Sequence, residues 1–496
     1  MQNLNESLQA KYPHLELAIL PLSQVNKDNE SKRIDSEYFK KEYLENEEII
    51  VSQSKIKDFL EFRIKNIKTL NLNKNFAYLQ ISDINTNNGL EYSTTKIDFT
   101  QIPDRATYVL RNNDICISTV RPNRNAVALI KDSKRLVGTS GFCVLRLKEK
   151  SEILPEVLYT FCKTKFFIAK MMRANTASLY PAVTDSDILK CLIPQFSQDF
   201  QLEIQKLVQD SHKALEDSKR LYKEAQELLY KELELDFKNP LESLLKSSLQ
   251  AKKPSELAII NDISKKYPHL NISVRPLSKS LHKSGRLDSE YYQSKYDLME
   301  TKIKDYKGGY CKLQDIGFFT NGSFIPENLY TQHAKRAYIR IRELSFNAPI
   351  RIQECIYIDD NFEATNETMV KQNDFVIATI GNTIGKINLI PKELNGSFIS
   401  NNTSRFRLTD TSIIPEFLEL LLRNFVVQEQ IQREFTQTAQ PKISNTSLEN
   451  ILIPKIATAT QEQIALKIQK SFTLRAKSKD LLQNAKIKLE NAIENG

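Results

Sequence analysis

The chain has few of the residues that build metal sites and disulfide frameworks, and it has no long apolar run. Its six cysteines are scattered without a C-x-x-C pair, which argues against a zinc site and fits a reduced cytoplasmic compartment. No apolar run reaches the roughly 18 residues of a membrane span. The start, Met1-Gln2-Asn3, lacks the basic and apolar regions of a secretory signal. We therefore expect a cytoplasmic protein without a membrane partner.

Motifs for catalysis are also absent. The sequence contains no G-x-x-x-x-G-K-[ST] phosphate loop, no G-x-G-x-x-G after a strand and no H-E-x-x-H. It lacks the Asn/Asp-Pro-Pro-aromatic motif that an amino-methyltransferase needs, and its five histidines are too dispersed for a zinc site. Paired carboxylates such as Glu47-Glu48 and Asp359-Asp360 lie in polar stretches, which favours a solvated surface over acid–base chemistry. We expect no catalytic residue, metal or cofactor in this chain.

The charge is unbalanced toward the basic side, with a formal net charge of +9 and a pI near 8.9. This balance suits a polyanionic partner, because each Lys or Arg near a phosphate releases counterions. Abundant Lys, Asn and Ile with only 12 Gly would also follow from an A/T-rich genome. Charge alone therefore leaves the partner open.

The most informative pattern present is an amphipathic helix that occurs twice, 260 residues apart (464 − 204 = 260). Apolar and small residues recur at steps of four and three, which is the heptad seam of packed helices. We expect the following residues to pair the helices: Ile204, Val208, Leu215, Tyr222 and Leu229 in the first copy, and Ile464, Ile468, Leu482 and Leu489 in the second. Small residues recur every seven positions, at Ser211 and Ser218 in the first copy and at Ser471 and Ser478 in the second. Small side chains allow the backbones of two paired helices to approach closely.

The repeat extends beyond the helices, so the chain is a duplication of whole domains and not a solenoid, whose periods are shorter. The matching segments are 11–15 with 266–270, 33–39 with 286–292, 113–114 with 373–374 and 192–194 with 452–454. The predicted organisation is a first domain at 1–198, a long helix at 199–235, a linker at 236–265, a second domain at 266–458 and a second long helix at 459–496.

Each domain is predicted to be α+β, with mixed β structure and short helices. In the first copy, strands are expected at 76–81, 114–120, 126–130 and 142–147, and helices at 35–46, 155–173 and 201–235. The linker carries a short apolar helix at 241–249 between the breakers Asn239-Pro240 and Lys252-Lys253-Pro254. The repeated Asp35/Glu37 and Asp288/Glu290 are interpreted as capping residues, with a salt bridge to Arg33 or Arg286, because this explains them better than catalysis.

We expect the two long helices, each about 50 Å at 1.5 Å per residue, to pair as an antiparallel coiled coil about a pseudo-twofold axis. The alternative is that each helix packs on its own domain. The length of the sustained heptad favours pairing, because it exceeds that of an ordinary globular helix.

This organisation resembles the specificity subunit of type I restriction–modification enzymes, over nearly the whole chain. The order domain, helix, domain, helix carries most of the resemblance. Local phrases add to it: 78–84 (YLQISDI), 113–119 (NDICIST) and Leu-Ile-Pro before Gln461-Glu462-Gln463-Ile464. The segment 377–389, with Gly381 and Gly385, resembles the glycine-containing hairpin of the family. Residues 121–125 depart from it, because Arg-Pro-Asn-Arg-Asn replaces the glycines.

The resemblance implies that each domain is a target-recognition domain that reads one half of a split, asymmetric site in double-stranded DNA. The helices would space the domains and dock two methyltransferase subunits, with restriction–translocase subunits added for cleavage. S-adenosylmethionine would bind the methyltransferase and not this chain. Three different interpretations stay open: a specificity subunit whose partner fuses methylase and nuclease, a coiled-coil scaffold that binds only protein, and an enzyme with an unrecognised site.

The DNA-binding candidates lie in polar turns between predicted strands. Arg and Asn are the side chains that contact guanine and adenine edges bidentately. In the first copy the candidates are Arg121, Asn123, Arg124 and Asn125, and in the second they are Asn382, Thr383 and Lys386. Arg340, Arg342 and Lys442 are candidates for phosphate contacts. A solvated hairpin without a ligand is the alternative for any one of them.

Overall fold

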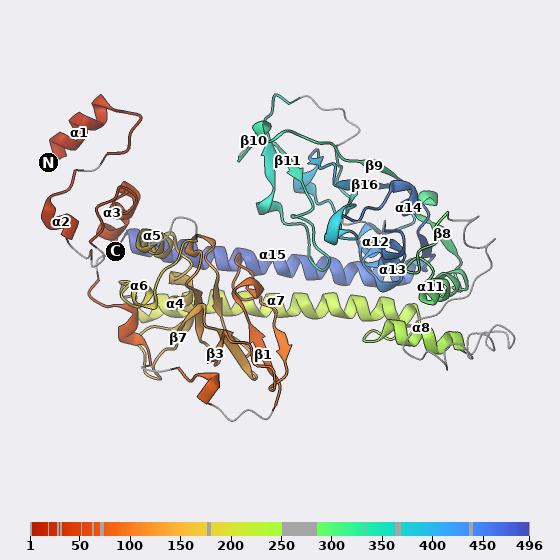
Figure 1. The fold of residues 1–496 in the computed structure, drawn as a ribbon, viewed down its shortest axis with the longest axis horizontal. Helices are drawn as coiled ribbons and strands as arrows, with labels where there is room; N and C mark the ends of the chain where they lie inside the picture. Colours follow the sequence, from red (N-terminus) through yellow and green to blue (C-terminus); the bar gives the residue numbers. More distant parts are fainter. Residues whose placement is uncertain are drawn as a thin grey trace. The chain divides into compact units, whose positions relative to one another are not determined.

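The computed structural model shows a mixed α and β protein with two long helices (Figure 1). It describes residues 2–249 and 285–495, apart from 18, 27–28, 30–31, 51, 62–63, 70–73, 176–179, 333, 363–368 and 436–439. The predicted second copy of the 11–15 phrase, at 266–270, and the Lys252-Lys253-Pro254 breaker lie outside the described residues. No described helix combines the length and apolarity needed to cross a membrane.

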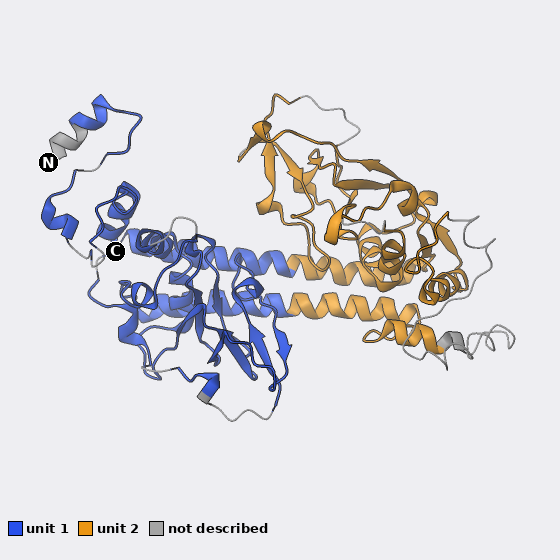
Figure 2. Ribbon diagram, in the orientation of Figure 1, with its two compact units in different colours: residues 1–216, 474–496 blue, residues 217–473 orange. Residues whose placement is uncertain are grey.

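The chain divides into two compact units (Figure 2). Unit 1 comprises residues 1–216 and 474–496, and unit 2 comprises residues 217–473. The first long helix, α7 (Gln198–Glu232), and the second, α15 (Thr458–Glu494), both contribute to each unit. Each unit therefore combines a globular part with a segment of both long helices.

Two sheets and five short helices form the globular part of unit 1. The four-stranded sheet has the order β2-β1-β6-β3, and the three-stranded sheet has the order β5-β4-β7. The strands are β1 (Phe76–Leu79), β2 (Thr95–Ile97), β3 (Ala106–Val109), β4 (Ile115–Ser118), β5 (Val127–Leu129), β6 (Leu136–Thr139) and β7 (Phe142–Leu145). The helices are α2 (Leu22–Asn26), α3 (Lys41–Ile49), α4 (Pro155–Phe161), α5 (Lys165–Ala174) and α6 (Asp185–Leu189), with α1 (Gln2–Lys11) at the start of the chain.

Unit 2 repeats this plan with sheets of order β10-β12-β11-β15 and β14-β13-β16-β9, and adds the pair β17-β8. The strands are β8 (Tyr310–Lys312), β9 (Gly317–Asn321), β10 (Tyr330–Thr331), β11 (Arg336–Ile339), β12 (Ile356–Ile358), β13 (Phe375–Ala378), β14 (Ile387–Leu389), β15 (Phe398–Ile399), β16 (Thr403–Leu408) and β17 (Leu452–Pro454). The helices are α8 (Pro240–Leu249), α11 (Ser294–Lys304), α12 (Pro415–Leu422), α13 (Phe425–Arg433) and α14 (Asn445–Glu449).

The predicted elements are largely present, with two corrections. The helix expected at 35–46 starts later, at Lys41, because residues 36–39 form a turn that Asp35 caps. The helix expected at 155–173 is two helices. The break falls at Thr164, whose hydroxyl accepts a hydrogen bond from the Phe167 amide at 3.3 Å and caps a new helix. In the second copy Asn424 caps α13 in the same way.

Within each unit, the segments of α7 and α15 contact each other and also the globular part. In unit 1, Ile204, Val208 and Leu215 share one hydrophobic cluster with Leu489 and with side chains of α4 and α5, and Leu482 packs against it. In unit 2, Leu229, Ile464 and Ile468 lie in a second cluster with residues of α12 and α13, and Tyr222 packs against it. Helix–helix packing and packing on the domain therefore occur together.

Buried serines form hydrogen bonds between these helix segments. In unit 1 the Ser211 hydroxyl donates to the Ser478 carbonyl at 2.7 Å, and in unit 2 the Ser471 hydroxyl donates to the Ser218 carbonyl at 2.8 Å. Charged pairs flank them: Lys488 with Glu203 in unit 1, and Lys467 with Glu224 in unit 2. In each unit the order of these contacts shows that the two helix segments run antiparallel.

Candidate nucleic-acid interface

The candidate residues of unit 1 form a tight turn between the antiparallel strands β4 and β5. Pro122–Arg124 make one 3₁₀ turn, and the residues on both sides are left-handed, with φ of 52° at Arg121 and 46° at Asn125. Few non-glycine residues adopt this conformation. The Arg121 amide donates to the Pro181 carbonyl at 2.7 Å, which anchors the first residue of the turn.

The turn of unit 2, between β13 and β14, is left-handed at the same two positions. Gly381 and Gly385 have φ of 76° and 88°, and the 3₁₀ turn Gly381–Thr383 begins one position earlier than its counterpart in unit 1. The Gly381 amide donates to the Pro441 carbonyl at 2.9 Å. Arg121 and Asn125 of unit 1 therefore occupy the positions of the two glycines (381 − 121 = 260; 385 − 125 = 260), and the departure seen in the sequence leaves both positions left-handed.

The side chains of the two turns differ in exposure. Asn123, Arg124 and Asn382 are exposed. Thr383 and Lys386 are half-buried, and burial followed by repulsion from Arg351 lowers the pKa of the Lys386 amine. The three exposed residues are thus the ones best placed to reach a ligand.

The side chains of Arg121 and Asn125 are partly buried within the turn and are less available to a ligand than those of Asn123 and Arg124. Arg121 is half-buried, and its guanidinium lies 5.8 Å from the ring centroid of Tyr180, within cation–π range. The Asn125 side-chain oxygen is buried and accepts no hydrogen bond from the described residues.

Lys442 lies beside the turn of unit 2, although it is far away in the sequence. It forms a β-bridge with Ile380, the residue before the turn, and its side chain is exposed. The matching bridge in unit 1 joins Val120 to Ala182. The structure therefore brings Lys442 to the same surface as Asn382.

Arg340 and Arg342 are placed less favourably for phosphate. Both pair with Glu343, whose side chain is fully buried, at 2.8 and 3.3 Å. The carboxylate offsets their charge, although Arg342 remains largely exposed. Arg351, which the sequence interpretation missed, donates to the Arg342 carbonyl and pairs with Glu354. The Lys386 amine lies 6.0 Å from the ring centroid of Phe346, so the segment from Arg342 to Arg351 lies near the turn.

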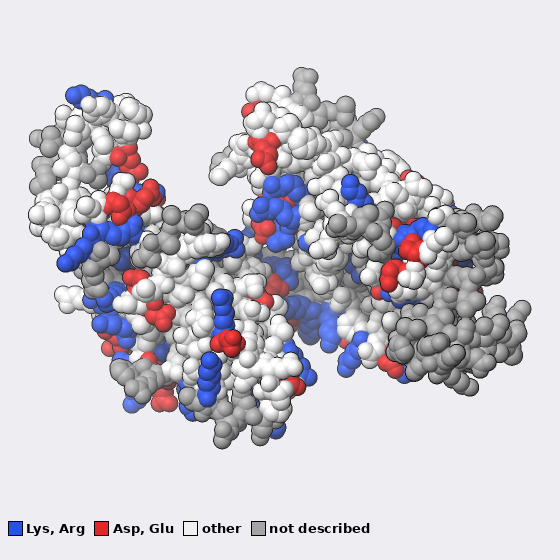
Figure 3. Space-filling model, in the orientation of Figure 1, with Lys and Arg blue, Asp and Glu red and all other residues white. Residues whose placement is uncertain are grey.

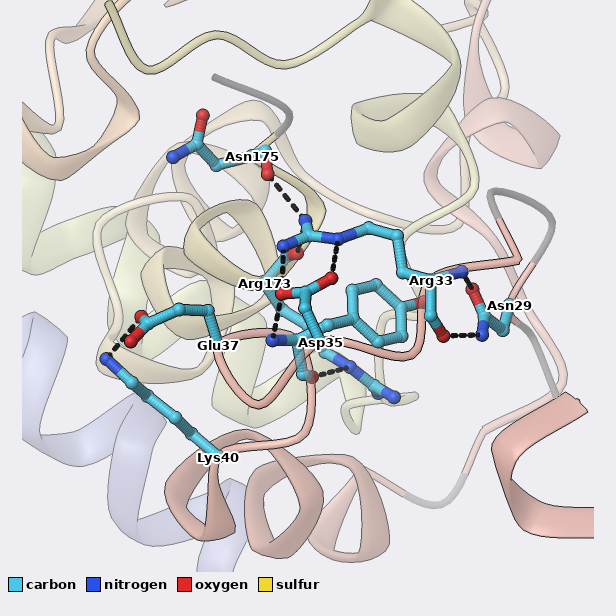
Figure 4. Close-up of polar contacts among 8 residues, drawn as sticks. Asn29, Arg33, Asp35, Glu37, Lys40, Arg173 and Asn175 are labelled. Atoms are coloured by element: carbon cyan, nitrogen blue, oxygen red, sulfur yellow. Dashed lines mark hydrogen bonds and ion pairs between the residues drawn. The ribbon is translucent and has the colours of Figure 1, made fainter. Parts of the chain in front are cut away.

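The Arg-x-Asp phrase of unit 1 holds the end of α5 (Figure 4). Arg33 pairs with Asp35 at 2.6 Å and donates to the Asn175 carbonyl at the end of α5. Asp35 accepts from the Tyr38 amide, and the bond from Arg33 lowers the pKa of this carboxyl. The predicted salt bridge is present, but Asp35 caps a turn and not the predicted helix, and Glu37 pairs with Lys40.

The second copy of this phrase makes the same contacts. Arg286 pairs with Asp288 at 2.7 Å, and Asp288 accepts a hydrogen bond from the Tyr291 amide at 3.1 Å. Arg286 also donates to the Arg433 carbonyl at the end of α13. Each unit therefore has the predicted salt bridge, and in each the Asp caps a turn.

A second repeated pair supports the strands next to the turns. Asp114 and Arg146 form a buried ion pair at 2.6 Å, and Asp374 with Arg407 repeats it at the same distance. This pair accounts for the repeated Asn-Asp phrase at 113–114 and 373–374 in structural terms.

The surface and the thiols show no sign of chemistry. On the visible face of each unit, Lys and Arg are interspersed with Asp and Glu (Figure 3). Among the described residues, no group of His, Cys, Asp and Glu is arranged to hold a metal ion. All six cysteines are free and buried, and burial raises the pKa of every thiol, which makes them poor nucleophiles.

Residues 305–490 match the family model of the type I restriction modification DNA specificity domain. The resemblance found in the sequence is thereby confirmed over this region, which matches a family of non-catalytic DNA-recognition components. Comparison with curated proteins gave no match.

Solved structures of similar proteins cover most of the chain. One comes from a study of complex assembly and conformational transition of the type I R-M system (18% identity, 89% of this chain and 96% of that one, TM-score 0.31). Another is the HsdS subunit from Thermoanaerobacter tengcongensis (19%, 89% and 96%, 0.31). A third is the type I S subunit from M. genitalium (12%, 89% and 94%, 0.40). With TM-scores below 0.5, these similarities place no individual residue of this chain.

Proposed function

We propose that this chain is the specificity subunit of a type I restriction–modification complex, and that each unit reads one half of a split, asymmetric DNA site through its turn. The observation that carries this proposal is the pair of turns. Both turns are left-handed at the same two positions, and each is anchored by a proline carbonyl. They nevertheless expose different side chains: Asn123 and Arg124 in unit 1, and Asn382 in unit 2. Two turns with a similar backbone and different exposed side chains would suit two different half-sites.

The exposed side chains fit base reading. An Arg guanidinium matches the two acceptors of guanine, and an Asn amide matches the donor and acceptor of adenine. Arg124 and Asn123 would therefore read bases in one half-site and Asn382 in the other. Lys442 beside the second turn would contact phosphate, since Lys acts there as a point charge.

The long helices would act as the spacer. Two tandem target-recognition domains, at 1–198 and 266–458, would be joined by an antiparallel coiled coil of α7 and α15. The serine contacts and charged pairs within each unit support this pairing. The same helices would dock two methyltransferase subunits, with restriction–translocase subunits added, and S-adenosylmethionine would bind the methyltransferase.

Selection from random DNA tests the proposal. The full chain is mixed with a library of random duplexes, and the bound DNA is sequenced at several salt concentrations. We expect a bipartite asymmetric motif and an affinity that falls as salt rises, because phosphate contacts release counterions. Salt-independent binding without an enriched motif would contradict it and favour the protein-only scaffold.

A fused methylase–nuclease partner and an intrinsic enzymatic activity each require a different measurement. A neighbouring gene that encodes one chain with both methylase and nuclease motifs would assign the subunit to a fused system. Methyl transfer by the purified chain alone would show an enzyme, which the family match speaks against.

A further inference from the structure

A lysine at the corner between α4 and α5 ties the turn of unit 1 to a second loop. The Lys163 amine donates to the Asn125 carbonyl at 3.0 Å, at the end of the turn, and to the Thr86 carbonyl at 2.7 Å. One nitrogen therefore fixes two loops that lie 39 residues apart in the sequence (125 − 86 = 39). The two carbonyls are neighbours at the surface of the unit.

Unit 2 has an arginine at the same corner, between α12 and α13. Arg423 (423 − 163 = 260) donates to the Ile387 carbonyl at 2.8 Å, just after the turn, and to the Ala348 carbonyl at 3.2 Å. Its charge is balanced by buried Glu419 at 2.6 Å. Arg423 thus joins the second loop of unit 2 to the start of β14, next to the turn, whereas the Gly385 carbonyl, which matches that of Asn125, accepts from the Gln428 amide at 2.9 Å.

The second loop of unit 1, residues 85–89, is held tightly. Gly89 is left-handed with φ of 60°, and a Cβ there would lie 2.1 Å from the Val127 carbonyl oxygen of β5. The Tyr159 hydroxyl of α4 donates to the Asn88 carbonyl. The loop is therefore a rigid neighbour of the turn.

Both second loops expose an asparagine at the matching position. Asn87 and Asn347 (347 − 87 = 260) are exposed, and within the described part of the chain neither side chain makes a hydrogen bond. An exposed Asn amide is a donor–acceptor pair suited to an adenine edge or to a phosphate.

We infer that Lys163 and Arg423 are positioning residues that join the turn to the second loop, so that Asn87 and Asn347 belong to the DNA-reading surface of their units. The inference rests on the proposed function. It assigns each unit a reading surface of two loops, clamped by one cation. Loss of the Lys163 amine would leave the Thr86 carbonyl without a donor among the described residues. The Asn125 carbonyl would keep only the Val127 amide, at 3.0 Å, and left-handed Asn125 would be free to relax.

The test uses selection from random duplexes with the full chain, four single variants and one double variant. Asn87→Ala should relax a position of the same half-site that Arg124→Ala changes, and leave the other half-site intact. Lys163→Met should weaken base preference about tenfold at both sets of positions, and Lys163→Arg should restore most of it. Combined with Arg124→Ala, Lys163→Met should be non-additive, because both act on one surface.

Lys165→Met is the matched control. Lys165 is the neighbouring exposed lysine. Among the described residues it pairs with Glu494 and not with the turn. The Lys165→Met variant should therefore select the wild-type motif. If Lys163→Met fails to fold, the Asn87→Ala variant still tests whether the second loop contacts DNA. The Asn87 side chain is exposed, so its replacement should not affect folding.

The outcomes separate the two claims. If wild-type chain and the Arg124→Ala variant select different motifs but Asn87→Ala selects the wild-type motif, the two-loop surface is wrong and the proposed function stands. An unchanged motif with folded Lys163→Met would overturn the positioning role in the same way. If the wild-type chain selects no motif, the proposed function itself fails.

Discussion

Ser211 and Ser478 place their hydroxyl oxygens 2.8 Å apart, although 267 residues separate them in the sequence. Ser218 and Ser471 repeat this contact at 3.0 Å, and all four side chains are buried. A hydroxyl at this position is small enough for close helix approach and polar enough to require a partner. The pairs therefore define which residues of α7 and α15 face each other.

Enlarging one of these serines should cost more than removing its hydroxyl. Ser478→Ala leaves Ser211 with the backbone carbonyl only and should lower the free energy of unfolding by about 1 kcal/mol. Ser478→Leu forces the helix segments apart and should cost about 3 kcal/mol. Thermal melting of the full chain measures both, with exposed Thr473→Ala as the control. Equal costs for the two variants would show that the site is not closely packed.

The glycines of the second turn should not be equivalent. At Gly381, with φ of 76°, a Cβ meets no atom within 4 Å, so Gly381→Ala should cost only the backbone strain of about 1 kcal/mol. At Gly385 a Cβ would lie 2.4 Å from the Gln428 side-chain oxygen. Gly385→Ala should therefore cost about 1 kcal/mol more, since Gln428 must also release the Gly385 carbonyl.

Urea unfolding checks this order. Gly396→Ala, with φ of 81° and open space around it, serves as the control away from the turn. A larger loss at Gly381 than at Gly385 would contradict the contact at Gln428.

Lys163 should make the stability of the chain depend on alkaline pH. Burial, with a smaller repulsion from Lys486, lowers the pKa of its amine to about 8 from 10.5. Between these values the unfolded chain holds a proton that the folded chain has lost, so this group adds stability as the pH rises from about 8 to 10.5. The gain should be at most about 3 kcal/mol.

The comparison of wild type with Lys163→Met isolates this effect, because all other groups titrate in both. The difference between their free energies of unfolding should rise with pH across that window. A difference that is constant from pH 7 to 10 would show that the amine is solvated.

Replacement of the exposed turn residues should act on one half-site at a time. Arg124→Ala should cost about 1–3 kcal/mol at one base position if the guanidinium reads a base, and Asn382→Ala should relax a position in the other half-site. Binding to single-base variants of the selected site measures both. Uniform weakening across all sequences, with a smaller salt slope, would instead assign Arg124 to phosphate.

The helices should set the gap between the half-sites. Seven residues inserted after Ser218 alone should frustrate pairing, whereas a second insertion of seven residues just before Ser471, which faces Ser218, should restore it. Because seven helical residues add roughly 10 Å, the doubly lengthened chain should prefer a gap longer by a few base pairs. Mapping methylated sites in cells that carry it gives the gap, and an unchanged gap would exclude the helices as the ruler.

Features that depend on local periodicity could be predicted from the sequence. The heptad spacing identified Ile204 and Val208, both fully buried, because the helix period alone decides which face they share. The turn at 121–125 was predicted because Pro and Asn cluster between two apolar runs. The Arg33–Asp35 salt bridge could be predicted as well, because the two residues are only two positions apart.

Features that depend on distant partners could not be predicted. The contacts of Lys163 join segments 77 and 38 residues away, and no spacing rule indicates them; the matching Arg423 was the one signal in the sequence. The left-handed backbone of Arg121 is unusual for an arginine. The only sequence signal for it was that Arg121 aligns with Gly381 in the repeat. Arg340 was assigned to phosphate, yet Glu343, three residues later, engages it.

The left-handed positions that the two turns share have a consequence for how such a chain can change. Arg121 and Asn125 adopt the conformation of Gly381 and Gly385 because the surrounding carbonyls and cations hold the loop, and not because of the residues within it. The exposed side chains of the turn, such as Asn123 and Arg124, can therefore change with little effect on folding. A duplicated gene with this property can diverge in one reader while the other stays fixed, so that new target sequences arise by local substitution on an inherited framework.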